Sequence, residues 1–408
     1  MRILFLTENY PPETNAAATR VYERAVYWAR WGHEVTVITS APNFPQGKLF
    51  PGYANRWRQR ERADGIEVLR VKTFIARNEG VVLRTLDFLS FMANGYLAGL
   101  FERRPDVVVA TSPQFFTAVA GWAIGACRRI PFVFELGDLW PRSILAVGAL
   151  RNGAAIAALE RLELFLYRRA RKVIALTQAF KDDLTRRGIR PDKITVIRNG
   201  VDLPRYAPRP RDAVLARAWG LADAFVIGYL GTHGMAHDLS RVLDAAALLR
   251  PSPTPRFLFV GAGAERERLI IEAKRRGLDN VVFQPMQPKE TISRVWSLCD
   301  VALVHLKDAP AFAEVIPSKI FEAMAMGLPI LLASPDGEAR TVLEESGAGL
   351  WVPAGDPEAL AAAIRRLADD EGLRRRLASA SLAAAPRHSR ERQARAVLEA
   401  LAAAKDMP

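Results

Sequence analysis

Two glutamates, Glu314 and Glu322, stand eight positions apart near the start of an expected helix. The residues between them include Ile316, Pro317, Ser318 and Lys319. Proline suits the first position of a helix and glycine suits its end, so Pro317 and Gly327 predict a helix over residues 317–326. Free N–H groups at such a helix start bind anions, and Lys319 adds a positive charge there. We interpret this segment as an anion site bordered by two carboxylates.

The paired carboxylates indicate what the anion is attached to. A carboxylate repels phosphate but accepts hydrogen bonds from hydroxyl pairs, such as those of a ribose and a hexose. Phosphate between two sugars is the arrangement of a nucleotide sugar, which is the chemistry that this segment suits. A capped amphipathic helix with Glu322 in solvent accounts for the same spacing, and the spacing by itself leaves both interpretations open.

A glycine-rich segment is a second candidate for contact with phosphate. It holds Gly231, Thr232, His233 and Gly234 directly after a strand-like run, and Gly261 has a similar place one strand later. Glycines at such a turn let the backbone approach a ligand and direct N–H groups at phosphate. The segment lacks the ending of a P-loop and the spacing of the dinucleotide fingerprint. A tight turn without a ligand therefore explains it at least as well.

Other polar residues carry weaker signals. Asp138 follows a strand-like run, where it could orient a hydroxyl or a positively charged sugar centre, or cap the next helix. The five histidines, at positions 33, 233, 237, 305 and 388, show no metal-binding spacing, so we expect no metal site. The two cysteines lie far apart in apolar runs, which excludes a disulfide framework and fits a reducing compartment.

The elements that position these residues alternate regularly along the chain. Strand-like runs occupy residues 2–7, 34–39, 66–71, 106–110, 132–135, 172–176 and 193–197, and then 225–230, 256–260, 280–283, 300–304, 329–332 and 349–352. Helical patterns lie between them, so the sequence predicts an α/β fold with parallel sheets covered on both faces. Ligands of such sheets bind outside the carboxyl ends of the strands, which is where the glycines, Asp138 and Glu314 fall.

A proline-rich stretch divides the two series of strands. Residues 203–211 contain three prolines and are typical of a linker. We predict an N-terminal Rossmann-like domain over residues 1–203, a C-terminal Rossmann-like domain over 204–385, and a final helix over 386–408. Two such domains that face each other would form a cleft lined by the loops after their strands.

Composition and charge narrow the class further. The chain has 408 residues and a net charge of +13, of which residues 1–204 carry +11. Half of the residues are hydrophobic and a quarter are charged, which excludes disordered, collagen-like and disulfide-scaffold proteins. The basic half suggests an anionic membrane surface, nucleic acid or a phosphorylated substrate, although GC-rich coding also produces arginine-rich chains. We expect no nucleic-acid partner, because no recognised motif accompanies the charge.

Two segments of the basic half suit a membrane surface. Residues 56–62 combine four arginines with Trp57, and residues 81–101 are mostly apolar. A solvated arginine-rich loop explains the first segment equally well. Arg84 and Asp87 interrupt this stretch, and the part from residue 86 to 101 is shorter than the roughly 20 residues of a spanning helix, so it predicts a buried or membrane-surface helix. The first residues lack a signal-peptide core, and we expect a cytoplasmic protein.

Taken together, these motifs resemble glycosyltransferase family 4, whose members are retaining enzymes with the GT-B fold. Glu314 and Glu322 match the E-x7-E signature, and residues 323–329 follow with Ala-x-Ala-x-Gly-x-Pro. Residues 196–202 resemble the domain-junction motif. The runs Tyr10-Pro11-Pro12-Glu13, Gly32 to Thr39, Pro42 to Gly47 and Asp138-Leu139-Trp140-Pro141 are similar to colanic-acid and fucosamine-type transferases, a subgroup that builds bacterial surface polysaccharides.

The resemblance implies a role for each matched residue. Glu314, Lys319 and Asp138 would be catalytic, with Glu314 on the donor hexose and Glu322 on the ribose hydroxyls. The nucleotide sugar would contact Glu322, Ser318, Pro317, Ile316, Gly231, Thr232, His233, Gly234, Gly261, Pro285 and Met286. Asn15, Ala16, Ala17 and Thr19 would face the acceptor. The final helix would return to the N-terminal domain, as in the GT-B fold.

Two departures from the family pattern change these expectations. Many members have glycines in the first loop, where this chain has Ala16, Ala17 and Ala18. Many also carry an arginine and a lysine in the loop after residues 225–230, where Thr232 and His237 stand here. Lys319 would then be the main cation on the leaving diphosphate.

We therefore expect retaining transfer of a hexosyl unit, with N-acetylated amino and deoxy sugars included, from a nucleoside diphosphate sugar. Uridine is the expected base, and the acceptor is a lipid-linked or glycan molecule of surface polysaccharide synthesis. The resemblance implies neither a metal nor another cofactor. Peripheral association with an anionic membrane surface, on the inner face of the cytoplasmic membrane, stays open. The alternatives are a nucleotide-sugar epimerase of the same fold and a non-catalytic basic protein that binds membranes or nucleic acid.

Overall fold

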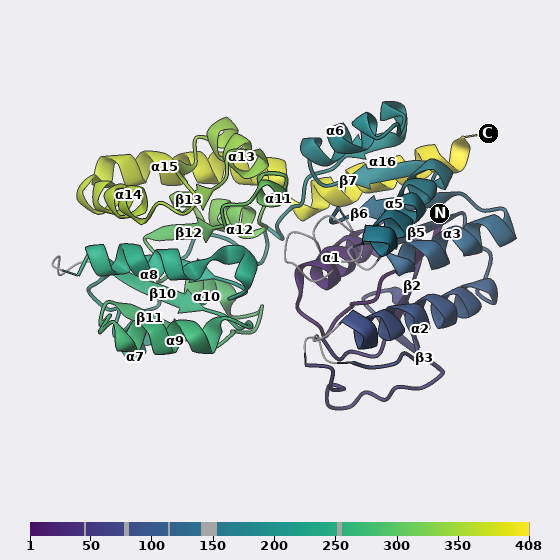
Figure 1. Cartoon of the computed structure of the whole chain (residues 1–408), viewed down its shortest axis with the longest axis horizontal. Coiled ribbons are helices and arrows are strands. Elements are labelled where there is room, and N and C mark those ends of the chain that lie inside the picture. Colours follow the sequence, from purple (N-terminus) through teal and green to yellow (C-terminus); the bar gives the residue numbers. More distant parts are fainter. Residues whose placement is uncertain (45, 77–80, 113–114, 140–152, 251–254, 408) are drawn as a thin grey trace. The chain divides into compact units, whose positions relative to one another are not determined.

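The computed structural model describes the chain except residues 45, 77–80, 113–114, 140–152, 251–254 and 408. Contacts divide it into an N-terminal unit, which holds Met1–Asn199 and the segment from Arg390 onward, and a C-terminal unit, Gly200–Ser389. Each unit is a mainly parallel sheet with helices packed on it (Figure 1). The predicted fold class, two Rossmann-like α/β domains, is confirmed.

The N-terminal unit contains an eight-stranded sheet in the order β3-β4-β2-β1-β5-β6-β7-β8. Its strands are β1 (Arg2–Leu6), β2 (Glu34–Ser40), β3 (Arg58–Ala63), β4 (Ile66–Val71), β5 (Val107–Thr111), β6 (Phe132–Leu136), β7 (Lys172–Ala175) and β8 (Ile194–Val196). Its helices are α1 (Ala16–Arg30), α2 (Val81–Leu100), α3 (Phe116–Arg128), α5 (Gly153–Arg169), α6 (Gln178–Arg186) and α16 (Arg390–Asp406). Central strands are buried throughout, as expected for a sheet covered on both faces.

The last helix, α16, belongs to the N-terminal unit because its contacts with α1 are specific (Figure 1). The indole nitrogen of Trp28 donates to the carbonyl of Ala394 at 2.8 Å. Arg390 forms an ion pair with Glu23 at 2.9 Å, and both side chains are buried. The return of the final helix to this unit, which the resemblance implied, is therefore present in the fold.

The chain passes from one unit to the other at Asn199 and Gly200 and returns at Ser389 and Arg390. Residues 200 and 388 approach closely, since a Cβ on Gly200 would lie 2.8 Å from the carbonyl oxygen of His388. This explains why the junction motif requires glycine at that position.

The C-terminal unit contains a six-stranded parallel sheet in the order β11-β10-β9-β12-β13-β14. Its strands are β9 (Phe225–Leu230), β10 (Pro255–Val260), β11 (Val281–Gln284), β12 (Val301–His305), β13 (Ile330–Ser334) and β14 (Gly349–Pro353). Its helices are α7 (Ala213–Ala218), α8 (Leu239–Leu248), α9 (Arg266–Arg275), α10 (Ile292–Trp296), α11 (Pro310–Ala313), α12 (Lys319–Met326), α13 (Glu338–Ser346), α14 (Pro357–Asp369) and α15 (Glu371–Ala384). Alternate residues of β9 enter two hydrophobic cores, Val226 and Leu230 on one face and Ile227 and Tyr229 on the other.

The arginine-rich segment is a strand and not the solvated loop considered above. Residues 58–63 form β3, which pairs antiparallel with β4 at the edge of the sheet. Arg58 and Arg60 both form ion pairs with Glu102 at 2.5 Å. Charged side chains on an edge strand prevent pairing with other chains, which accounts for their number here.

The apolar segment forms α2, one face of which is exposed. Leu83 and Leu97 are each 51% exposed, Leu86 is 46% exposed, and Phe101 directly after the helix is 78% exposed. No helix within the described part of the chain has both the length and the apolar character to cross a bilayer.

Candidate active site

The order of strands in the C-terminal sheet defines where a ligand binds. Strand β9 lies between β10 and β12, so the chain leaves the ends of β9 and β12 in opposite directions. In parallel sheets, ligands bind at the carboxyl ends of the strands beside such a switch point. The segments that emerge there are the glycine-rich loop 231–238 and the segment 306–318, which leads into α12.

The glycine-rich loop is interlocked with the turn after β10. A Cβ on Gly261 would lie 1.9 Å from the carbonyl oxygen of Gly231, and one on Gly263 would lie 2.4 Å from that of His233. Both glycines have positive φ, near +150°, which L side chains rarely adopt. His233 also donates its N–H to the carbonyl of Ala262 at 2.9 Å. Glycine is thus needed at 261 and 263 so that the two turns pack together.

Two histidines hold the other end of this loop on β12. His237 Nδ1 donates to the carbonyl of His305 at 3.2 Å, and His305 Nδ1 donates to the carbonyl of His237 at 2.7 Å. The N–H of Lys307 donates to the carbonyl of Ala236 at 2.9 Å. Burial lowers the pKa of His237 to about 3 and also lowers that of His305, so both imidazoles are neutral at physiological pH. Sequence reasoning gave these histidines no such positioning role.

Helix α12 begins two residues later than predicted. Ser318 is its N-cap and Lys319 its first residue, so Pro317 precedes the helix instead of opening it. The first N–H to bond within this turn is that of Ile320, which donates to the carbonyl of Pro317 at 3.1 Å. The N–H groups of Ser318 and Lys319 precede that bond, so the positive end of the helix dipole lies at these residues.

The Lys319 side chain is only 8% exposed, and its Nζ has no hydrogen-bond partner among the described residues. The ammonium lies 3.6 Å from the centroid of the Tyr229 ring. It also borders the glycine-rich loop, since a Cβ on Gly231 would lie 3.1 Å from Nζ. Burial lowers the pKa of Lys319 to about 7, against the opposing effect of Glu322. A buried ammonium with unused donors beside a helix N-terminus is suited to bind an anion.

The two glutamates of the signature lie at either side of this lysine in the chain. Glu314 directly follows α11, and Glu322 is in the first turn of α12. Glu322 accepts a hydrogen bond from the indole nitrogen of Trp296 at 3.3 Å, so α10 helps to orient the carboxylate. Both glutamates are partly exposed. Sequence reasoning missed Trp296, which is fully buried.

His233 is another buried side chain of this site whose polar atoms have no hydrogen-bond partner among the described residues. Its two ring nitrogens have no hydrogen-bond partner within the part of the chain that is described, and the ring lies against Tyr229, Phe259 and Phe283. Burial, with smaller effects of Lys319 and Arg266, lowers the pKa of His233 to about 4. The ring is therefore neutral and has both a donor and an acceptor to offer a ligand.

The other residues that were predicted to contact the nucleotide sugar lie around the same edge of the sheet. Thr232 is exposed and accepts, through its carbonyl, a hydrogen bond from the Tyr229 hydroxyl at 2.8 Å. Gly234 precedes a short 3-10 turn. Pro285 and Met286 follow β11 and are exposed, and Ile316 is partly buried against the core. The structure thus groups Gly231, His233, Gly261 and Lys319 directly, with the other residues on adjoining segments.

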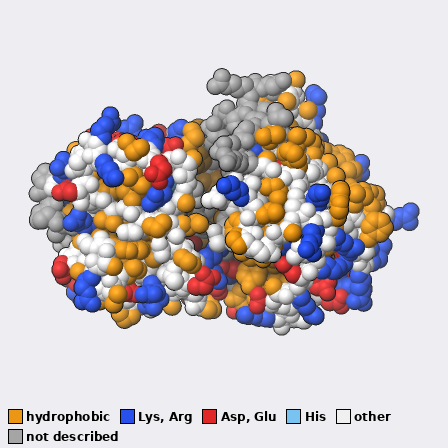
Figure 2. Space-filling view, turned by 90° about the horizontal axis from the view of Figure 1, so that it is seen from below, with side chains coloured by type: hydrophobic (Ala, Val, Ile, Leu, Met, Phe, Trp, Pro, Cys, Tyr) orange, Lys and Arg blue, Asp and Glu red, His pale blue; other side chains and the backbone are white. Residues whose placement is uncertain are grey.

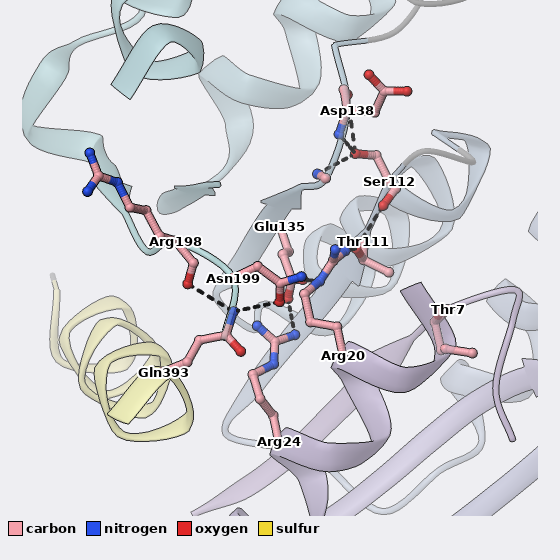
Figure 3. A network of polar contacts seen from close by, with 12 residues as sticks. Thr7, Arg20, Arg24, Thr111, Ser112, Glu135, Asp138, Arg198, Asn199 and Gln393 are labelled. Carbon is pink, nitrogen blue, oxygen red and sulfur yellow. Dashed lines mark hydrogen bonds and ion pairs between the residues drawn. The ribbon is translucent and has the colours of Figure 1, made fainter. Parts of the chain in front are cut away.

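Asp138 lies in the N-terminal unit, at the carboxyl end of β6 (Figure 3). The Ser112 hydroxyl accepts hydrogen bonds from the N–H groups of Gly137 at 2.8 Å and Asp138 at 3.3 Å. The backbone of this loop is therefore held by Ser112, the residue directly after β5, and Figure 3 shows the Asp138 carboxylate directed away from Ser112. Residues 140 and 141 of the motif lie outside the described residues.

Beneath Asp138 lies a buried ion pair network that sequence reasoning missed (Figure 3). The Glu135 carboxylate pairs with Arg20 at 2.8 Å and with Arg24, and all three side chains are at least 95% buried. Arg20 also donates to the Thr111 hydroxyl at 3.2 Å. The network joins α1 to β5 and β6, and so positions the start of α1 relative to Asp138.

The expected acceptor loop forms the N-terminus of α1. Asn15 is its N-cap. Its Oδ1 accepts a hydrogen bond from the N–H of Ala18 at 2.9 Å, and its backbone carbonyl accepts one from the hydroxyl of Thr19. Ala16 is exposed and Ala17 partly exposed in the first turn. Asn15 and Thr19 thus have structural roles at the helix start, and their contact with an acceptor stays a prediction.

Two interacting carboxyl groups of the N-terminal unit, those of Glu8 and Asp87, were not predicted from the sequence. Glu8 follows β1, and burial, with a smaller effect of Asp87, raises the pKa of Glu8 to about 8. Burial raises that of Asp87, on α2, to about 6. No group of three or more His, Cys, Asp or Glu side chains in the described residues is arranged to hold a metal ion.

Two domain families match the chain. Residues 15–200 match the glycosyl transferase 4-like domain, and residues 217–383 match the glycosyl transferases group 1 domain. The first match covers most of the N-terminal unit, and the second covers the strands and helices around Lys319.

Similar proteins match over nearly the whole chain. The putative colanic acid biosynthesis glycosyl transferase WcaI of Escherichia coli K12 is 27% identical, over 90% of this chain and 92% of its own. A GDP-mannose-dependent alpha-mannosyltransferase of Mycobacterium tuberculosis is 28% identical, over 88% and 85%. The structure of Anabaena Alr3699/HepE in complex with UDP-glucose superposes with a TM-score of 0.75, at 22% identity over 99% and 100%. The chain belongs to the glycosyltransferases that join a glycosyl transferase 4-like domain to a group 1 domain, and it has the GT-B fold.

Proposed function

We propose that the protein transfers a hexosyl unit from a nucleoside diphosphate sugar, with retention of the anomeric configuration, to a lipid-linked or glycan acceptor of bacterial surface polysaccharide synthesis. The observation that carries this proposal is the buried Lys319 ammonium, which has no hydrogen-bond partner among the described residues and lies beside Gly231 at the switch point. The relatives named for colanic acid synthesis support the polysaccharide assignment.

In this proposal the donor extends across the edge of the C-terminal sheet. The diphosphate lies between the Gly231–Gly234 turn and the N–H groups of Ser318 and Lys319. Glu322, held by Trp296, accepts from the ribose hydroxyls, and Glu314 accepts from the hexose. Pro285 and Met286 border the base, which we propose to be uracil because similar folds bind UDP and UDP-glucose.

The proposed chemistry depends on the leaving group. As the bond between the anomeric carbon and the diphosphate breaks, negative charge grows on the phosphate oxygen. Fixed N–H dipoles and Lys319 stabilise that charge without reorganising, which is commonly the largest catalytic contribution. The acceptor hydroxyl then attacks from the face that the diphosphate leaves and gives its proton to the departing phosphate oxygen, so retention needs no covalent intermediate with the protein. Asp138 orients the acceptor or the positively charged sugar centre.

A transfer assay tests this function. Purified protein is incubated with a panel of nucleoside diphosphate sugars and membrane lipid extracts, and proton NMR follows the anomeric configuration. We expect nucleoside diphosphate to be released only when donor and acceptor are both present, with an α-linked product from an α-linked donor. Conversion of the donor sugar without any acceptor would identify an epimerase and contradict the proposal.

Glu322→Gln is expected to weaken UDP binding about 10–100-fold, because a hydrogen bond to a charged acceptor contributes about 1.5–3 kcal/mol. Titration calorimetry with UDP measures this directly. Glu358→Gln, an exposed glutamate at the start of α14, is the control and should leave the affinity unchanged. Equal affinities of the Glu322→Gln variant and the unmodified protein would exclude the ribose role.

We also propose that α2 associates with the inner face of the cytoplasmic membrane, where lipid-linked acceptors are available. Leu83, Leu86 and Leu97 form an exposed apolar stripe on this helix. Lys72, whose ammonium lies 4.7 Å over the Trp57 ring, adjoins α2, because its carbonyl accepts a hydrogen bond from the side chain of Asn94 on that helix. Figure 2 shows hydrophobic side chains beside Lys and Arg side chains on the N-terminal unit, as an anionic surface would require.

Vesicle sedimentation tests this surface. Replacing both Leu86 and Leu97 by glutamate is expected to lower binding to phosphatidylglycerol vesicles at least 10-fold, since each buried leucine contributes about 1.5–3 kcal/mol. Ile271→Glu, on an exposed position of α9, is the matched control. Sedimentation that is the same for all variants, or the same with purely zwitterionic vesicles, would contradict the membrane proposal.

A further inference from the structure

The Lys319 ammonium rests on an aromatic ring rather than on an anionic partner. Its Nζ is 3.6 Å from the centroid of the Tyr229 ring, close to the shortest separation at which a cation can contact a ring face. Tyr229 is 1% exposed, at the last but one position of β9. The lysine comes from the first turn of α12, so the contact joins the two segments that border the switch point.

Tyr229 is itself fixed to the glycine-rich loop. Its hydroxyl donates to the carbonyl of Thr232 at 2.8 Å, across the turn that begins at Gly231. The absence of a side chain at Gly231 leaves room for the ammonium, since a Cβ there would lie 3.1 Å from Nζ. One residue thus sets the position of both the proposed phosphate cation and the turn that faces it.

We propose that Tyr229 is a positioning residue that keeps Lys319 charged and correctly placed before the donor binds. This inference rests on the proposed function, in which the Lys319 ammonium is the cation that binds the diphosphate of the donor. The ring face supplies partial negative charge without a carboxylate, which would otherwise repel that diphosphate. When the donor arrives, the unused Nζ donors become available to phosphate oxygens.

The other titratable groups around Lys319 do not stabilise its positive charge at short range as the Tyr229 ring does. The groups that interact with its charge are Glu322 on its own helix, His233 and His237 in the loop after β9, and His305 at the end of β12. Arg266 of α9 acts on His233 and adds further positive charge nearby. The three histidines are neutral, and the carboxylate of Glu322 already accepts from Trp296. The Tyr229 ring is thus the face that stabilises the charged lysine at short range.

The test varies the electron density of the ring at constant shape. Phenylalanine and its mono-, di- and trifluorinated analogues are incorporated at position 229, and the titration of Lys319 in the free protein is followed by NMR of 13C-labelled lysines. Fluorine withdraws electrons from the ring face, so the pKa of Lys319 should fall stepwise, by about 0.5–1 across the series. The same series at Phe259, a buried ring beside Tyr229, is the control and should leave the lysine unchanged.

Donor binding provides the second readout. Because the charged lysine binds phosphate, UDP affinity should fall as pH rises through the pKa of Lys319, and this fall should begin at lower pH in the fluorinated proteins. At pH 8 we expect UDP affinity to be about 3–10-fold lower for trifluorophenylalanine than for Tyr229→Phe, with little difference at pH 6. An unchanged Lys319 titration across the series overturns the role of Tyr229. A shifted titration together with no UDP binding by any form supports that role and overturns the proposed function instead.

Discussion

Lys319→Ala is expected to lower kcat by about 10²–10³-fold with little change in thermal stability. Loss of one fixed donor to a developing negative charge has an effect of this size in other enzymes. The glycine-rich loop cannot supply a replacement cation, because residues 231–238 contain neither lysine nor arginine. The variant should fold, since removing a buried ammonium without a hydrogen-bond partner also removes the cost of burying it.

Steady-state kinetics with donor and acceptor measures this effect, and circular dichroism checks the fold. Lys274→Ala, an exposed lysine in the last turn of α9, is the matched control and should retain full activity. A Lys319→Ala variant with unchanged kcat would remove this residue from the chemistry. The leaving group would then have to be stabilised by backbone N–H groups alone.

Glu135→Gln is expected to lower the free energy of unfolding by about 3–5 kcal/mol. The carboxylate is fully buried and pairs with both Arg20 and Arg24, so its neutralisation leaves two buried guanidinium groups without a counter-charge. Burial alone would raise the pKa of Glu135, but the two arginines outweigh it and the pKa is lowered. The pair therefore stabilises the fold above pH 4.5, and this contribution is lost as the pH falls further.

Urea unfolding of the two proteins at pH 7 measures the difference. Glu34→Gln removes an ion pair of similar geometry with Arg103 at 3.1 Å, but both of those side chains lie mainly in solvent. It should change the stability by less than about 1 kcal/mol. A Glu135→Gln variant as stable as the Glu34→Gln control would show that the network contributes nothing to the N-terminal unit.

The alternation of apolar runs and helical segments was sufficient to predict the fold class. Strands such as Val107–Thr111 are buried on both faces, so their sequence is apolar throughout and easily recognised. Strand β3 was missed because it is an edge strand, where Arg58 and Arg60 are held by Glu102, far away in sequence. Local pattern alone cannot reveal a strand whose charges are satisfied by a distant partner.

Sequence motifs were sufficient to predict the site residues that determine the local backbone. They did not predict contacts between side chains that are distant in the sequence and come together only in the fold. Gly231, Gly261 and Lys319 were singled out from their types and spacing, and the structure groups them at one sheet edge. Tyr229 was not, because a tyrosine in a buried strand is ordinarily a core residue, and only the fold brings Lys319 onto its ring. Glu135 was missed for the same reason, since its two arginines come from a different element.

A diphosphate bound at Lys319 is central to the proposed function, and a crystal structure of the protein with UDP tests its presence most directly. We expect a phosphate oxygen within hydrogen-bond distance of Lys319 Nζ and of the N–H groups at the start of α12, with the ribose hydroxyls on Glu322. A nucleotide bound elsewhere at saturating concentration, with no phosphate at Lys319, would contradict the proposed function.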